Sequence, residues 1–241
     1  MKKWVYAYVF CAVLVLYLAQ VQAEDARHAA YCMAAQAFVE NHILPNGEAI
    51  EQDNEEDFSE NKLAIVDVDG DGQPELLIRF QTGSIASNQL FVCGFNEETG
   101  KLILKFIGMP ESTFYRNGSV KENASHNQGL AGDFWPYSIS TYNAQKKEYE
   151  LMGSVDAWSR EAYPTNPFEN DAPFPQKIDV TGDGFVYFID DEHFEGARGS
   201  DTPVDTPIYK AWVHHYLGQS EPILIRWFPA DAQGISGLKA Q

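Results

Sequence analysis

The sequence predicts an α+β fold, in which an antiparallel β-meander is covered by one helix near the N-terminus and another near the C-terminus. Short runs rich in Val, Ile, Phe and Tyr recur from residue 63 onward, and turn-forming residues separate them. No helical segment lies between these runs, which argues against alternating βαβ units. A small β-propeller or barrel is the alternative arrangement of such strands.

The first 23 residues have the pattern of a signal peptide. Lys2 and Lys3 form a short positive region, an apolar run follows over residues 4–18, and Val21-Gln-Ala23 offers small residues for cleavage after Ala23. The apolar run is shorter than the ~20 residues of a membrane-spanning helix. We therefore expect an exported protein, secreted or held in the periplasm or cell envelope, with no stable membrane span after cleavage.

The remaining residues, 24–241, are expected to form a single domain. Its first helix covers residues 25–43 and stops at Pro45-Asn46-Gly47, and residues 48–61 form a polar, acidic linker. A second helix runs from residue 205 or 206 to 217, with Pro207 in its first turn and Gly218 after its end.

Eight strands are predicted between the helices, and residues 223–228 offer a last one. Residues 96–100, 117–118 and 143–146 have the composition of turns that join adjacent antiparallel strands. The predicted strands cover residues 63–67, 75–81, 89–95, 101–107, 112–116, 136–142, 148–154 and 185–189.

The chain is strongly acidic. It has 17 basic and 35 acidic residues, and loss of the first 23 residues would remove two of the basic ones and no acid, giving a formal charge of −20. Such a protein has no affinity of its own for nucleic acid or anionic lipid, and its charge favours the binding of cations. Most of the acids, including the clusters at 48–60 and 190–192, are read as solvated surface.

Two cysteines, Cys32 and Cys93, remain after cleavage. In an exported protein they could form a disulfide. Both lie among apolar neighbours, so two buried free thiols are the other interpretation.

The most specific motif is Asp67-Val-Asp69-Gly-Asp71-Gly-Gln73-Pro-Glu75. Carboxylates on alternate residues can direct their oxygens at one centre, and glycines permit the tight turn that this requires. A plain hairpin turn would gain nothing from four mutually repelling carboxylates. We expect Ca²⁺, bound by Asp67, Asp69, Asp71, Gln73 through its carbonyl, and Glu75, with an affinity in the ~10⁻⁴ to 10⁻³ M range of extracellular modules.

This motif differs from an EF-hand, because Ile78 stands where the bidentate acid would be and the following residues have strand character. Over residues 67–76 it resembles the calcium loops of FG-GAP and VCBS-type repeats, with their pattern Asp-x-Asp-x-Asp-Gly-x-x-Asp/Glu-Leu. That resemblance implies extracellular calcium binding and, by weaker association, adhesion or carbohydrate-linked roles. The chain as a whole resembles small exported bacterial proteins of unknown function, which implies no activity.

A second Asp-Gly loop begins at Asp179. Counted in the same way, Asp179, Thr181 and Asp183 offer oxygens at positions 1, 3 and 5, and Asp190 offers an acid at position 12, which resembles a dockerin or EF-hand loop. Tyr187 stands at position 9, and the intervening residues look like a strand. A plain hairpin and a metal site are both open interpretations of this segment.

A possible ligand groove lies in the middle of the chain, where polar side chains alternate with aromatic ones. Flat rings can stack on a saccharide or peptide while amides fix its orientation. The competing interpretation places the aromatic residues in the core of a sheet. The groove residues are His126, Asn127, Gln128, Asp133, Trp135, Tyr137, Asp156 and Trp158.

Whether the protein is an enzyme stays open, with a binding role favoured. The sequence has no Gly-x-Ser-x-Gly elbow, no His-Glu-x-x-His zinc helix and no phosphate-binding glycine loop. We expect an exported calcium-binding module with a structural or binding task, possible ligands being a glycan or a cell-surface component. The alternative is a secreted hydrolase of glycans or cell-wall material, with its site near His126, Asp133 and Asp156.

Overall fold

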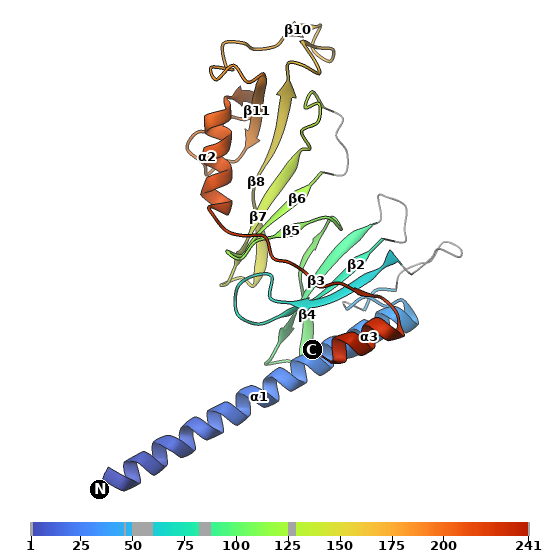
Figure 1. The fold of residues 1–241 in the computed structure, drawn as a ribbon, viewed down its shortest axis with the longest axis vertical. Coiled ribbons are helices and arrows are strands. Elements are labelled where there is room, and N and C mark those ends of the chain that lie inside the picture. The colour runs from blue at the N-terminus through green and yellow to red at the C-terminus, as the bar shows by residue number, and fades with distance from the viewer. Residues whose placement is uncertain (1, 46, 50–59, 82–87, 125–128, 241) are drawn as a thin grey trace.

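The computed structural model describes residues 2–45, 47–49, 60–81, 88–124 and 129–240, with side chains from residue 21 onward. The described residues form a five-stranded and a six-stranded antiparallel sheet, the six-stranded one above the other in the view of Figure 1, together with a small two-stranded sheet, and three helices pack against the two larger sheets. The helices are α1 (Lys2–Asn41), α2 (Thr206–Leu217) and α3 (Ala232–Lys239). The strands are β1 (Lys62–Val66), β2 (Glu75–Phe80), β3 (Gln89–Asn96), β4 (Lys101–Gly108), β5 (Thr113–Phe114), β6 (Ser119–Asn123), β7 (Tyr137–Asn143), β8 (Glu148–Ser159), β9 (Thr165–Asn166), β10 (Ala172–Pro173), β11 (Phe185–Asp190), β12 (Gly199–Val204) and β13 (Phe228–Pro229).

The first sheet has the strand order β13-β1-β2-β3-β4, so four consecutive strands form a meander. One of its faces packs against α1 and α3, which lie side by side (Figure 1). Tyr31 and Phe38 of α1 and Leu238 of α3 are fully buried there against Leu76 and Ile78 of β2. Burial of large apolar side chains of this kind stabilises a fold by roughly 1.5–3 kcal/mol each.

The second sheet has the order β12-β11-β8-β7-β6-β5, again a meander in which only the short β9–β10 hairpin interrupts the sequence. Helix α2 lies across one of its faces (Figure 1), with Trp212 fully buried against Tyr137 and Ile189. Asp205 caps α2 by accepting a hydrogen bond from the N–H of Thr206.

A third apolar cluster joins the two sheets. Leu77 and Val92 of the first sheet share it with Phe114 and Val120 of the second, and Tyr149 packs at its border. The chain between α2 and α3 runs past both sheets (Figure 1), and Ile223, Ile225 and Trp227 contact the same cluster. The sheets therefore form one continuous body, with a seam between them.

The predicted α+β class and antiparallel meander are confirmed. Neither sheet closes on itself over the described residues, because the outer strands of each are not paired with each other. Nor does the described part of the chain that carries side chains contain a helix long and apolar enough to cross a membrane. The eight predicted strands are present, although the strand expected at 112–116 is only two residues long.

Several elements differ from the prediction. Helix α1 begins at Lys2 and is continuous through the expected cleavage position, while β6, β12 and α3 were not predicted. The strand expected at 223–228 is wrong except at its end, since only Phe228–Pro229 pairs with β1. Most of the expected acidic linker, residues 50–59, lies outside the described residues. Cys32 and Cys93 are buried free thiols.

Candidate metal loop and neighbouring sites

The Asp67–Glu75 loop joins β1 to β2 and is held by its own side chains. The carboxylate of Asp67 accepts hydrogen bonds from the N–H groups of Gly70 (2.8 Å) and Gly72 (3.0 Å). Both glycines have positive φ angles, 78° and 83°, which side chains with a Cβ rarely adopt. The sequence Asp-x-x-Gly-x-Gly therefore specifies the turn locally.

Three of the expected ligands meet in this turn. Carboxylate oxygens of Asp67, Asp69 and Asp71 lie within 4.8 Å of one another. Glu75 is fully buried at the start of β2, and its second oxygen accepts from the N–H of Val68 at 3.0 Å. Gln73 is exposed, and its N–H donates to Asp71 at 2.7 Å.

A lysine that the sequence did not single out stands among these carboxylates. The Nζ of Lys105 lies 2.5 Å from Asp69 Oδ2, 2.8 Å from Glu75 Oε1 and 3.5 Å from Asp71 Oδ2. Asp69 is 6% exposed and Glu75 is 1% exposed, so this is a buried ion cluster and not a surface pair.

The strand geometry explains how Lys105 reaches this position. The β3–β4 register shifts there, with Val92 opposite Phe106 and Cys93 opposite Leu104, so Lys105 is the extra residue of a bulge. A bulge redirects a side chain out of the regular alternation. Gly94 provides the space, because a Cβ there would lie 2.3 Å from the Lys105 Cε.

The protonation of the cluster follows from burial and pairing. Burial raises the pKa of Glu75 to about 8, although the Lys105 ammonium opposes this shift. Burial also raises the pKa of Asp69, against the same opposing effect. For Lys105, burial lowers the pKa, but Glu75 and Asp69 outweigh it and raise the pKa overall. Lys105 therefore stays charged at physiological pH, and the loop holds an internal cation.

The loop also lies at the seam between the sheets. The hydroxyl of Tyr149 on β8 donates to the carbonyl of Val68 at 3.0 Å, and the Lys105 Nζ lies 4.9 Å from the centre of the Tyr142 ring on β7. Gly118, before β6, approaches so closely that a Cβ would lie 2.8 Å from the carbonyl oxygen of Asp69. Whatever orders the loop therefore also orders the contact between the sheets.

The second Asp-Gly loop adopts the same turn. The N–H of Gly184 donates to Asp179 Oδ2 at 3.1 Å, and the N–H of Phe185 donates to Asp183 Oδ1 at 3.0 Å. The corresponding bonds exist in the first loop, and Gly182 and Gly184 have positive φ angles, 73° and 84°, close to those of their counterparts there. The two segments thus share one local conformation.

Of the expected ligands of this second loop, Asp190 lies away from it and Thr181 is bonded to another residue. Asp190 lies at the opposite end of β11, paired with Ser154, about 16 Å along the strand from Phe185. The prediction that Asp190 is a ligand of the loop is therefore wrong, because Asp190 lies at the far end of β11. Thr181 donates its hydroxyl at 2.8 Å to Asp205, a residue that the sequence had suggested only as a helix start.

Of the predicted groove residues that the structure describes, Tyr137 and Asp156 border one pocket and the others do not. Tyr137 and Trp158 are core residues, while Asp133 is exposed and Trp135 is 47% exposed with its indole N–H donating to Ala124. Among the described groove residues, Asp156 alone has a half-buried side chain. His126, Asn127 and Gln128 lie outside the described residues. The proposed grouping of Asp133 with Asp156 is wrong, because only Asp156 borders the nearest pocket.

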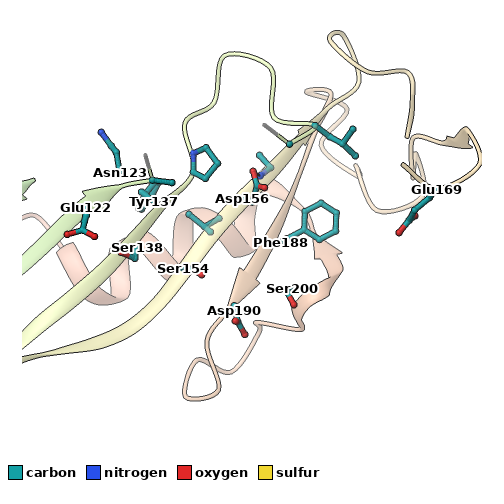
Figure 2. A pocket seen from close by; sticks show the side chains of 16 residues that line it. Glu122, Asn123, Tyr137, Ser138, Ser154, Asp156, Glu169, Phe188, Asp190 and Ser200 are labelled. Atoms are coloured by element: carbon teal, nitrogen blue, oxygen red, sulfur yellow. Dashed lines mark hydrogen bonds between the residues drawn. The ribbon is translucent and has the colours of Figure 1, made fainter. Parts of the chain in front are cut away.

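That pocket, of about 530 Å³, lies on the second sheet (Figure 2). Glu122, Ser138, Ser154 and Asp190 are direct neighbours across four adjacent strands, and Asp156 follows in the next row. Burial raises the pKa of Asp156 and also that of Glu122. The arrangement offers hydroxyl and carboxylate groups to a polar or cationic ligand.

The sequence contained a signal for Lys105, a single charge within the apolar run of residues 102–107. It contained no comparable signal for the row of residues that lines the pocket, because that row depends on strand register. Comparison with protein-family models, curated proteins and solved structures finds no match for this chain.

Proposed function

We propose that this protein is an exported binding or structural module whose Asp67–Glu75 loop binds Ca²⁺ and thereby stabilises the seam between its two sheets. The observation that carries the proposal is the convergence of the Asp67, Asp69 and Asp71 oxygens within 4.8 Å. Hard oxygen ligands in this number suit Ca²⁺ better than Zn²⁺. The signal-peptide pattern supports export, where calcium is plentiful.

In the absence of calcium, the Lys105 ammonium occupies the proposed site and defines its metal-free state. This ammonium already contacts oxygens of Asp69 and Glu75, so a Ca²⁺ ion has to displace it or share these oxygens with it. Competition of this kind lowers metal affinity, in line with a weak site. On this proposal α1 and α2 are structural covers, each protecting the apolar face of one sheet.

The test is calcium titration of the purified protein, read by calorimetry and by thermal unfolding. At a tenfold excess over Kd, calcium adds about 1.4 kcal/mol to the free energy of unfolding, roughly 3–5 °C in Tm. Asp71→Asn leaves Lys105 paired with Asp69 and Glu75, so it should fold and lose this response. Asp201→Asn, at an exposed site, is the control. Equal melting temperatures of wild type in calcium and in chelator would reject the proposal.

The alternative function, a secreted hydrolase acting on glycans or cell-wall material, has one observation in its favour. Asp156, Glu122 and Asp190 border one pocket, and burial raises the pKa of two of these carboxyls, as a general acid requires. A thermal-shift screen with glycans and cell-wall fragments, followed by assay of bond cleavage in hits, tests it. Loss of cleavage, with binding retained, in Asp156→Asn would support this alternative.

A further inference from the structure

The second Asp-Gly loop contains a buried carboxylate oxygen with no partner. The side chain of Asp179 is 1% exposed, and its Oδ2 accepts from Gly184 and lies 3.7 Å from Arg160 Nη1. Its Oδ1 has no hydrogen-bond partner among the described residues. The equivalent oxygen of the first loop, on Asp67, accepts from Gly70 at 2.8 Å. Leaving such an oxygen unpaired is unfavourable, so it requires an explanation.

The surroundings of Asp179 Oδ1 limit which groups can bind this oxygen. Oδ2 of the same carboxylate bonds across the turn to Gly184, and no N–H group of the described loop satisfies Oδ1. The nearby side-chain donors are already engaged: Thr181 with Asp205, and Thr206 with Asp183 Oδ2 at 2.6 Å. A small cation is the partner that a carboxylate oxygen in this setting takes most readily.

The groups around the turn are hard oxygens. Asp183 and Asp205 contribute carboxylates, and Thr181 contributes a hydroxyl that bonds to Asp205. Oxygen donors of this kind select calcium or magnesium over transition metals. Arg160 is the one basic side chain that pairs with Asp179 in the described structure, and it is half-exposed, so it can move aside.

We propose that residues 179–184 form a second divalent-cation site, of calcium's chemistry, in which Asp179 Oδ1 is the principal ligand and Asp183 and Thr181 assist. The site lies in the loop before β11, beside the N-terminus of α2, and uses no residue of the Asp67–Glu75 loop. Tyr187 is not a ligand despite its ninth position, because its ring stacks on Tyr209 at 4.0 Å. Binding here would tie the start of β11 to the helix cap at Asp205.

The experiment uses the full chain and Ca²⁺, in a background in which Asp67→Asn and Asp71→Asn disable the first loop. We expect this background to retain one calcium equivalent by calorimetry. Adding Asp179→Asn should weaken that binding about tenfold or more, the loss typical when a metal site loses a required group. Asp190→Asn, at the far end of β11, is the matched control and should leave the affinity within about twofold.

A variant that gains affinity guards against misfolding as the cause of a loss. Arg160→Gln removes a positive charge beside Asp179, so calcium should bind roughly threefold more tightly. Three results would each overturn the proposal: no calcium binding in the background, unchanged binding in Asp179→Asn, or no gain of calcium affinity in Arg160→Gln. Such a result is expected if a water molecule alone satisfies Oδ1. Failure of the first loop would appear separately, as a wild type that binds no more calcium than the background.

Discussion

Replacing Lys105 by Met tests the internal cation most directly. Met preserves much of the aliphatic stem that packs over Gly94 but removes the ammonium, leaving the buried carboxylates of Asp69 and Glu75 without a cation. Removing one partner of a buried ion pair costs about 3–5 kcal/mol. Burial already raises the pKa of Glu75 to about 8, so at pH 7 this carboxyl is largely protonated and the charge left without a cation is mainly that of Asp69, which limits the loss. We therefore expect the free energy of unfolding to fall by about 3 kcal/mol, near the lower end of that range, at pH 7 in chelator.

Thermal and urea unfolding with and without calcium measure this effect. A loss of about 3 kcal/mol corresponds to a Tm lower by roughly 6–12 °C in a protein of this size. Calcium should stabilise Lys105→Met more than wild type, because no ammonium competes with it for the Asp69 and Glu75 oxygens. The charge-balanced variant Lys105→Met/Glu75→Gln should recover part of the stability in chelator.

Two results would refute the reasoning. If Lys105→Met unfolds at the wild-type temperature in chelator, the ammonium does not stabilise the loop. If calcium stabilises the variant no more than the wild type, Lys105 and the metal do not compete for the same oxygens.

Three further predictions concern the seam, the second sheet and the cysteines. Gly118→Ala should cost about 1–3 kcal/mol more than Gly100→Ala in urea unfolding, since both have positive φ but only Gly118 abuts backbone. Burial opposes ionisation of Asp191, but hydrogen bonds from the Tyr and Trp side chains of α2 and from two N–H groups outweigh it and lower its pKa. Wild type should thus lose stability as pH falls below about 4. Asp191→Asn should not show this pH-dependent loss and should be about 2 kcal/mol less stable than wild type at pH 7. Cys32 and Cys93 should react with a thiol reagent only after denaturation, and protection that persists in denaturant without reductant would indicate a disulfide.

The parts of the fold that sequence predicted best are those decided by neighbours in the chain. The turns at 96–100 and 143–147 close through bonds from Gly100 to Asn96 and from Lys147 to Asn143. Residues of these types favour tight turns wherever they occur, so strand order within each meander could be predicted. The division into two sheets could not, because the segment between β4 and β5 has no signal that distinguishes a continued sheet from a new one.

In the candidate site, too, the features set by neighbouring residues could be predicted, and those set by distant residues could not. The hydrogen bonds of the Asp67–Gly72 turn join residues no more than five apart, and the repeated turn at Asp179–Gly184 shows that the local sequence suffices for it. The groove predicted around Asp133 and Asp156 failed because burial depends on which elements cover each face of a sheet. Tyr137 became core beneath α2, and Trp158 became core against Leu130 and Phe174.

The sequence by itself determined the acidic character, the antiparallel strands and the shape of both Asp-Gly turns, because each depends on composition or on bonds within a few residues. Only the tertiary structure decided that a lysine 36 residues from Asp69 stands among its carboxylates, and that Asp205 meets Thr181 across 24 residues. These contacts require a bulge, a glycine on the facing strand and the docking of a helix. Their energies come from burial, which no local pattern of residues specifies.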